Sequence, residues 1–121
     1  MSLEDLRRRL EDFAHARDWE QFHTPRNLVL ALVGEVGELA ELVQWRSDAD
    51  LLREAHGQAS GPFRSELADI LIYLVRLADV LGVDLEAAAR DKVDSNERRY
   101  PVDRSRGSAR KYNDLKEPTD S

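Results

Sequence analysis

The stretch 67–80 of this 121-residue chain is apolar around almost the whole circumference of a helix, and no other feature constrains the fold as much. Successive helical residues are rotated by about 100°, so the apolar side chains of this stretch leave no broad polar face. They are Leu67, Ile70, Leu71, Ile72, Leu74, Val75, Leu77, Ala78 and Val80. A helix that is apolar all round has to be buried all round. Because the few other helices of a short chain cannot cover it, we expect a homo-oligomer, a dimer or a tetramer, in which helices of different subunits pack together.

Helical periodicity recurs along the rest of the chain, and no alternation typical of strands is present. Start and stop signals bound the helices: Thr24 followed by Pro25 begins one, Gly82 ends another, and Pro101 stops the last. The expected helices span residues 3–18, 25–45, 49–55, 62–82 and 85–98. The fold class is therefore all-α, of the four-helix-bundle type. We expect one domain over residues 1–101, with a linker at 47–61, and a tail without apolar periodicity over residues 102–121.

The charge balance and the missing cysteines exclude several kinds of protein. The chain carries 18 lysines and arginines against 24 aspartates and glutamates, a net charge of −6, which disfavours nucleic acid polymers and anionic membranes as partners. Without cysteine it forms no disulfide, zinc–thiolate site or iron–sulfur cluster. No segment reaches the ~20 apolar residues of a membrane span, and the N-terminus is unlike a secretory signal. The expected location is the cytoplasm.

Two pairs of acidic side chains fall where helical periodicity places apolar ones. In the second expected helix, Glu35 and Glu38 lie about 60° apart and within the sector of the apolar stripe. Glu66 and Asp69 repeat this arrangement in the expected helix over residues 62–82. Each of the two helices therefore directs a Glu-x-x-Glu or Glu-x-x-Asp pair toward the interior. Glu41 lies on the flank of the stripe, as a supporting or a surface group.

Four carboxylates that face inward cannot all stay ionised without compensation, because like charges repel and buried charge is costly. Protons or a hard divalent cation would compensate them, and Mg²⁺ prefers oxygen ligands of this kind. The alternative is that these acids lie at the edge of the stripe and pair with arginines. A di-iron site would need Glu-x-x-His on two helices. Its nearest matches, Asp12-x-x-His15 and Glu20-x-x-His23, are poorly placed.

Cationic and aromatic side chains accompany the acids. In the last expected helix, which begins at Leu85, Lys92, Asn96 and Arg99 extend the apolar stripe at spacing i, i+4, i+7. Near a metal they would suit a polyphosphate, and the alternative is that they pair with the carboxylates themselves. Aromatic rings gather near helix ends, where they either stack on a nucleobase or pack in a core or interface. They belong to Trp19, Phe22, Trp45 and Tyr73, with His23 beside them.

Three motifs together resemble one protein family. They are DWEQFHTPRNLVLALVGEVGELAELVQW, ELADILIYL and KVDSNERRYP. This combination is similar to the MazG-like all-α nucleoside triphosphate pyrophosphatases, and within them to the dCTP pyrophosphatases. The resemblance covers most of residues 3–101, with a weaker echo in SARKY at 108–112. It implies hydrolysis of a nucleoside triphosphate between its α and β phosphates, which releases a monophosphate and pyrophosphate.

The resemblance also implies roles for individual residues. The Mg²⁺ ligands of the family correspond to Glu35, Glu38, Glu66 and Asp69. Residues that contact the base or the substrate correspond to Trp19, His23, Trp45 and Tyr73. The segment that binds phosphate and sugar corresponds to Lys92, Asn96, Arg99 and Tyr100. Leu10 stands where some relatives carry a pocket histidine, so the base preference stays open: dCTP or 5-modified dCTP, with dUTP or other non-standard nucleotides as the alternative. A helical module that binds metal without turnover is the non-enzymatic alternative.

Overall fold

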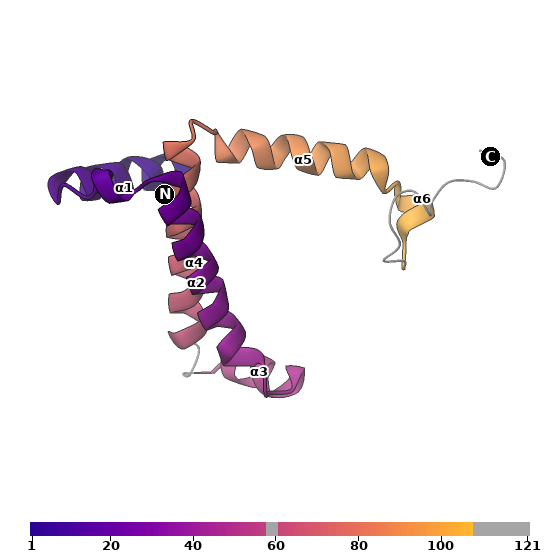
Figure 1. Ribbon diagram of the computed structural model, residues 1–121. Coiled ribbons are helices and arrows are strands. Elements are labelled where there is room, and N and C mark those ends of the chain that lie inside the picture. Colours follow the sequence, from indigo (N-terminus) through magenta and orange to yellow (C-terminus); the bar gives the residue numbers. More distant parts are fainter. Residues whose placement is uncertain (58–60, 108–121) are drawn as a thin grey trace. The chain divides into compact units, whose positions relative to one another are not determined.

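The computed structural model describes residues 1–57 and 61–107, and every regular element within them is a helix. The all-α prediction is therefore confirmed. The chain divides into two compact units, residues 1–84 and 85–121, which we describe separately. The first holds α1 (Leu3–Ala16), the 3₁₀ turn η1 (Glu20–Phe22), α2 (Pro25–Val43), α3 (Asp48–Ala55) and α4 (Gly61–Val80), and the second holds α5 (Leu85–Arg99) and α6 (Val102–Ser105) (Figure 1).

Local chemistry fixes both ends of α1. The hydroxyl of Ser2 accepts from the backbone N–H of Asp5, whose carboxylate accepts in return from the backbone N–H of Ser2. At the other end, Asp18 adopts a positive φ of 56°, and the backbone N–H of Trp19 donates to the carbonyl of Ala14 at 2.9 Å. This left-handed turn ends the helix at Ala16, two residues before the expected end.

The helices α2 and α3 begin at side-chain caps. Thr24 caps α2 with Pro25 in its first turn, as expected, and Ser47 caps α3. The helix α2 ends at Val43 rather than at Trp45, because Gln44 is already its C-terminal cap. The expected short helix in the linker is α3, and an ion pair between Arg46 and Glu54 joins its last turn to the preceding turn.

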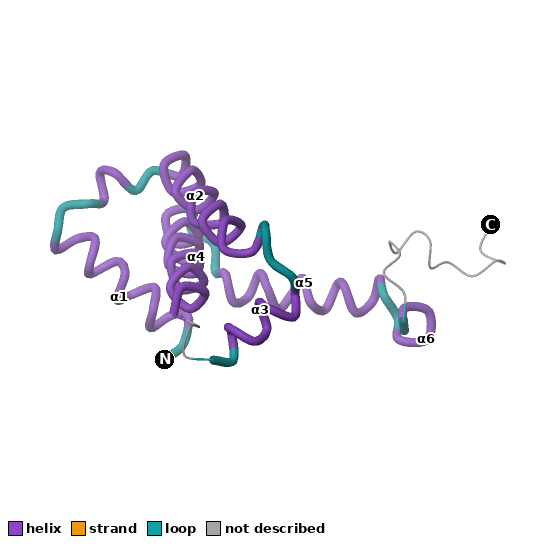
Figure 2. The backbone as a smooth tube through the Cα atoms, turned by 90° about the horizontal axis from the view of Figure 1, so that it is seen from below, coloured by secondary structure: helices purple, strands orange, loops and turns teal. Residues whose placement is uncertain are grey.

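The helices α2 and α4 form the central antiparallel pair of the first unit, and α1 packs against α4 (Figures 1 and 2). The C-terminus of α4 is closed as predicted at Gly82, which has a φ of 70°. The N–H of Gly82 donates to Asp79 at 3.0 Å and the N–H of Val83 donates to Ala78 at 2.8 Å. These two bonds satisfy carbonyls that the helix end leaves open.

The buried core of this unit is small. Among the described residues its apolar members are Ala14, Leu28, Val75 and Ala78, drawn from α1, α2 and α4. Arg76 is buried with them at 8% exposure. In contrast, several apolar side chains of α2 and α4 remain exposed: Leu30, Val33, Val36, Leu67, Leu71 and Ile72. The chain by itself therefore does not cover the apolar surface of α4, as the sequence predicts.

The second unit consists of α5 and α6 within residues 85–107. The helix α5 begins at Leu85 as expected and runs to Arg99. The tail was expected to lack helices, and α6 at Val102–Ser105 corrects this expectation over four residues. Residues 108–121, including Arg110–Tyr112, lie outside the described residues. No described helix combines the length and the apolar character that crossing a membrane requires.

Candidate active site

Three predicted carboxylates meet between α2 and α4. One oxygen from each of Glu35, Glu38 and Glu66 lies within 4.8 Å of the other two. Oε2 of Glu35 and Oε2 of Glu66 are buried and have no hydrogen-bond partner within the described residues. Buried carboxylate oxygens normally have partners. The cluster therefore has the donor set of a cation site, three carboxylates with two oxygens left unsatisfied.

Glu35 and Glu66 have a raised affinity for protons in this cluster. Burial, together with the neighbouring Glu66, Glu38 and Asp69, raises the pKa of Glu35 to about 7. Burial is also the first cause of the raised pKa of Glu66. A raised carboxyl pKa means that the ionised form is poorly compensated by the protein alone. This is the electrostatic setting in which a divalent cation binds with the release of protons.

Asp69 stands apart from this group of three. It lies one turn after Glu66 on α4, and its side chain is half-buried. Its charge nevertheless raises the pKa of both Glu35 and Glu66. Its role as a fourth ligand remains a prediction.

We expect the metal-free protein to lose stability through Glu35 as pH rises from about 4.5 to about 7. The folded state binds this proton more tightly than the unfolded state, so the contribution is complete below pH ~4.5 and disappears above the folded pKa. His23 acts in the opposite direction below pH ~6.5, because burial lowers its pKa. The contribution of Glu35 is therefore the difference in the free energy of unfolding between the wild type and Glu35→Gln.

Thermal unfolding across this range, in EDTA and in excess Mg²⁺, measures that difference. Mg²⁺ should cancel it, because an ion that binds only the folded, ionised cluster stabilises that state by mass action. A wild type that gains stability relative to Glu35→Gln as the pH rises without metal would contradict the expectation.

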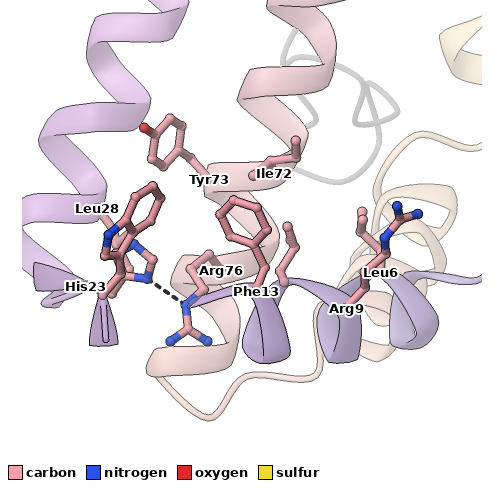
Figure 3. A pocket seen from close by; sticks show the side chains of 10 residues that line it. Leu6, Arg9, Phe13, His23, Leu28, Ile72, Tyr73 and Arg76 are labelled. Carbon is pink, nitrogen blue, oxygen red and sulfur yellow. Dashed lines mark hydrogen bonds between the residues drawn. The ribbon is translucent and has the colours of Figure 1, made fainter. Parts of the chain in front are cut away.

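A mostly apolar pocket of about 440 Å³ lies between α1, α4 and the segment that joins α1 to α2. Figure 3 shows Phe13 reaching it from α1, and Ile72 and Tyr73 reaching it from α4. Its walls are Leu6, Arg9, Leu10, Phe13, Trp19, His23, Leu28, Ile72, Tyr73 and Arg76. The structure thus brings together three residues predicted to contact the substrate, Trp19, His23 and Tyr73. Leu10, which stands where some relatives carry a pocket histidine, lines the same pocket.

The position of Trp19 follows from the end of α1. The turn at Asp18 directs its indole onto Phe13, with ring centroids 5.5 Å apart in an edge-to-face arrangement. Its ring also stands edge-to-face to His23, at 6.5 Å between centroids. A rigid aromatic wall of this kind provides a surface on which a flat ring can stack.

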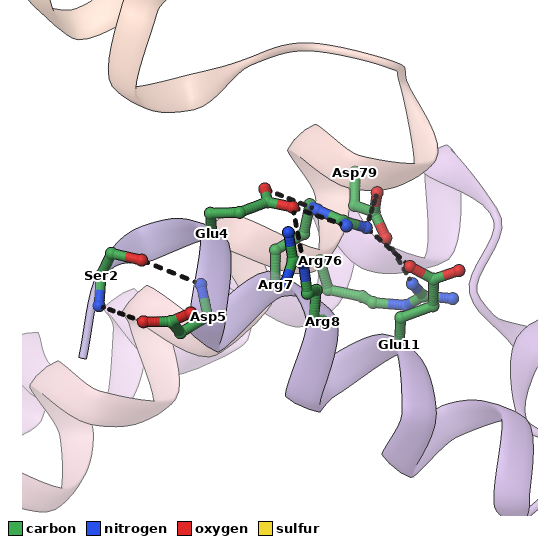
Figure 4. Close-up of polar contacts among 8 residues, drawn as sticks. All are labelled: Ser2, Glu4, Asp5, Arg7, Arg8, Glu11, Arg76 and Asp79. Carbon is green, nitrogen blue, oxygen red and sulfur yellow. Dashed lines mark hydrogen bonds and ion pairs between the residues drawn. The ribbon is translucent and has the colours of Figure 1, made fainter.

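Arg76 was not among the residues predicted from the sequence. Its Nε donates to Nδ1 of His23 at 2.9 Å, and its Nη1 donates to Asp79 at 2.9 Å. Asp79 also accepts from Arg7 of α1 at 3.1 Å (Figure 4). A signal was present, because Arg76 is the only basic residue between Glu66 and Val80. A single cation in so apolar a helix needs partners within the fold.

Comparison with known proteins identifies the family. The model of the MazG-like family matches residues 31–115, more than half of the chain. This chain belongs to the MazG-like family. A protein named dCTP pyrophosphatase 1 from Rattus norvegicus is 58% identical over 115 residues, which cover 94% of this chain and 68% of the relative. The protein of the same name from Homo sapiens is 53% identical over the same shares.

A solved structure agrees with the family assignment. The crystal structure of a pyrophosphatase from Archaeoglobus fulgidus superposes with a TM-score of 0.73 at 39% identity, over 81% of this chain and 91% of that one. The expected MazG-like fold is thereby confirmed. The acid cluster lies inside the segment that the MazG-like model matches, whereas Trp19 and His23 precede it.

Five other predicted residues of this MazG-like chain are not among the residues that line the pocket or form the cluster. Trp45 follows the end of α2 and is 88% exposed. Lys92, Asn96 and Arg99 are exposed on α5 at the expected spacing, and Tyr100 follows that helix. The last four belong to the second unit. The roles of all five remain predictions.

Proposed function

We propose that this MazG-like chain is a Mg²⁺-dependent nucleoside triphosphate pyrophosphohydrolase that acts on dCTP or on a 5-modified dCTP. Water would break the phosphoanhydride bond between the α and β phosphates and give a monophosphate and pyrophosphate. Relatives named dCTP pyrophosphatase 1 at 53% to 58% identity support this activity. The observation that carries the proposal is the cluster of Glu35, Glu38 and Glu66 with its two unsatisfied buried oxygens.

The residues present fit Mg²⁺, because the cluster offers only carboxylate oxygens and no nitrogen or sulfur ligand. Glu35, Glu38 and Glu66 would hold the ion, with Asp69 as the proposed fourth ligand. When bound, Mg²⁺ neutralises charge on the phosphate oxygens and promotes ionisation of a water. One of the ligand carboxylates would orient that water. Glu41, on the flank of the same helix, is a further candidate for this role.

The pocket would hold the nucleobase. Trp19 and Tyr73 offer flat faces on which a base can stack, and His23 offers a polar ring nitrogen beside them. Lys92, Asn96 and Arg99 of α5, with Tyr100 directly after that helix, would bind the triphosphate and the sugar. Arginine and lysine suit that task because they neutralise phosphate charge and donate several hydrogen bonds.

Product analysis tests the proposed function. The purified protein is incubated with Mg²⁺ and, in separate reactions, with each common dNTP, with dUTP and with 5-methyl-dCTP. We expect a monophosphate and pyrophosphate, formed fastest from a cytosine nucleotide. If the same products form fastest from a nucleotide with another base, the proposed reaction stands and the proposed substrate is wrong. A folded protein that hydrolyses none of them with metal present would favour a binding module without turnover.

Trp45→Ala is expected to weaken nucleotide binding by about 1–3 kcal/mol, the usual contribution of an aromatic ring stacked on a base. Because Trp45 is 88% exposed within the chain, its truncation should change the free energy of unfolding of the subunit little. Calorimetric titration with a non-hydrolysable dCTP analogue measures the loss. Unchanged affinity in a folded variant would remove Trp45 from the base site.

We further propose that the protein is a homo-oligomer whose subunits cover the exposed apolar residues of α2 and α4. Leu30, Val33 and Leu67 are each more than half exposed in the single chain. A Cβ atom at Gly34 or Gly37 of α2 would meet no described atom within 4 Å, so this face is open to a neighbour. Contiguous apolar surface of this kind marks association sites.

Val33→Lys should therefore shift the protein toward the monomer, because a lysine cannot be buried there without a partner. Light scattering after size-exclusion chromatography measures the mass. Asp12→Lys, which places the same cation on the exposed polar side of α1, should leave the mass unchanged. A wild type that is monomeric at micromolar concentration would refute the oligomer.

A further inference from the structure

A hydrogen bond joins Arg76 to His23, which are 53 positions apart in the sequence. Arg76 lines the pocket from α4, and His23 lines it from the segment before α2 (Figure 3). We propose that Arg76 is a positioning residue that holds His23 as a neutral imidazole with its proton on Nε2, and that this N–H donor selects cytosine over uracil and thymine at ring nitrogen N3. The first half of this proposal is a property of the protein alone. The second half rests on the proposed function, because it assumes a pyrimidine in the pocket.

The tautomer follows from the chemistry of the two partners. A guanidinium has only N–H donors and no acceptor. Since Nε of Arg76 donates to Nδ1 of His23 at 2.9 Å, Nδ1 must present its lone pair, and the proton of the neutral ring is on Nε2. Burial lowers the pKa of His23, and the charge of Arg76 lowers it further. Both effects oppose an imidazolium, which would need a second proton on Nδ1.

Arg76 is held in turn by a network that begins on the surface of α1. Asp79 accepts from Arg76 through Oδ2 at 2.9 Å and from Arg7 through Oδ1 at 3.1 Å. Arg7 is fixed by Glu4 at 2.8 Å and by Glu11 at 2.6 Å (Figure 4). The side chains of Arg76 and Asp79 are 9% and 19% exposed, so solvent screens their pair little. The guanidinium is thereby oriented with Nε toward His23.

The other side chains that line the pocket determine what the Nε2 proton of His23 can recognise. None of the ten lining side chains is a carboxylate or an amide, and Arg9, Trp19 and Arg76 offer donors only. The described hydrogen bonds include none from Nε2 of His23, so its proton is available to a ligand. N3 of cytosine is an acceptor, whereas N3 of uracil and thymine carries a proton. The opposite tautomer of His23 would accept that proton and reverse the preference.

Nitrogen NMR of the full-length wild type tests the first half directly. Two-bond proton–nitrogen correlations of a ¹⁵N-labelled sample at pH ~7.5 distinguish the two neutral tautomers and the imidazolium. The chain has three histidines, and the spectrum of His23→Gln assigns the signal of His23. We expect a protonated Nε2 and an unprotonated Nδ1. A protonated Nδ1, in either the other tautomer or the cation, would overturn the proposal without any arginine variant.

Arg76→Met tests whether Arg76 causes this state. It keeps an unbranched apolar side chain in the core and removes the donor, so His23 should become a mixture of tautomers. Arg9→Met is the matched control, because it removes an arginine from the same pocket with no recorded hydrogen bond to His23. The tautomer of His23 should be unchanged in Arg9→Met. An unchanged tautomer in a folded Arg76→Met would refute the role of Arg76.

The second half of the proposal, the selection of cytosine over uracil, is tested by the ratio of kcat/KM for dCTP to kcat/KM for dUTP. Arg76→Met should lower this ratio by about tenfold, the order expected when one buried hydrogen bond to the base is lost. A loss that affects both nucleotides equally would indicate a structural role only and would overturn this half. If the wild type releases pyrophosphate from neither nucleotide, the proposed function fails, while the tautomer remains measurable by NMR.

Discussion

Glu35→Gln is expected to lower the rate of pyrophosphate release from dCTP by at least about a hundredfold. Residues that merely support a metal ligand already cost about 10–100-fold when they are replaced, and Glu35 is a proposed ligand itself. Its Oε2 is one of the two buried oxygens that have no partner within the described chain. The amide of glutamine is neutral and binds Mg²⁺ weakly. Steady-state rates in saturating Mg²⁺ measure the loss.

The same variant should fold at least as well as the wild type when no metal is present. An amide removes one charge from a cluster in which the other carboxylates raise the pKa of Glu35. Asp12→Asn, which neutralises an exposed carboxylate on α1 outside the cluster, is the matched control and should retain the wild-type rate. Glu38→Gln and Asp69→Asn should lose turnover in the same way. A near-normal rate in Glu35→Gln would mean that the ion, if any, binds elsewhere.

Leu28→Ala is expected to lower the free energy of unfolding by about 2–5 kcal/mol. Leu28 is only 2% exposed and is the largest fully buried side chain among the described residues. The loss combines the transfer free energy of the removed carbons with the cavity left behind, and that cavity adjoins the pocket that Leu28 already lines. Urea unfolding monitored by circular dichroism measures the change, provided that the m-value stays constant.

Leu52→Ala provides the matched control for this prediction. Leu52 is also a leucine within a helix, but it lies on α3 and is 60% exposed. Its truncation should change the free energy of unfolding by no more than about 0.5 kcal/mol. A Leu28→Ala protein as stable as Leu52→Ala would show that the small core of the single chain contributes little, and that contacts between subunits hold the fold together.

Helix boundaries set by local chemistry could be predicted from the sequence. Thr24 with Pro25 and Gly82 act through hydrogen bonds and φ angles within a few residues, so their signals are visible without tertiary contacts. The ends of α1 and α2 lie two residues earlier than expected. The helix α1 ends at Ala16 because Asp18 adopts a left-handed conformation, which is uncommon outside glycine, and α2 ends before Trp45.

The acid cluster could also be predicted, because helical periodicity alone places Glu35 and Glu66 on the apolar sides of their helices. Periodicity gives the direction of a side chain but not its distance from another helix. Only the packing of α2 against α4 shows that Glu35, Glu38 and Glu66 approach within 4.8 Å and that Asp69 is not part of this group. The resemblance to MazG-like proteins suggested all four residues and could not distinguish them.

The all-α class, most helix starts and the inward direction of the acids follow from the sequence, because each depends on residues a few positions apart. The tertiary structure alone decided the pocket and the network that passes from Arg7 through Asp79 and Arg76 to His23. These contacts join α1, α4 and the segment before α2. Which donor meets which acceptor across such distances depends on how the helices pack, and no local pattern carries that information.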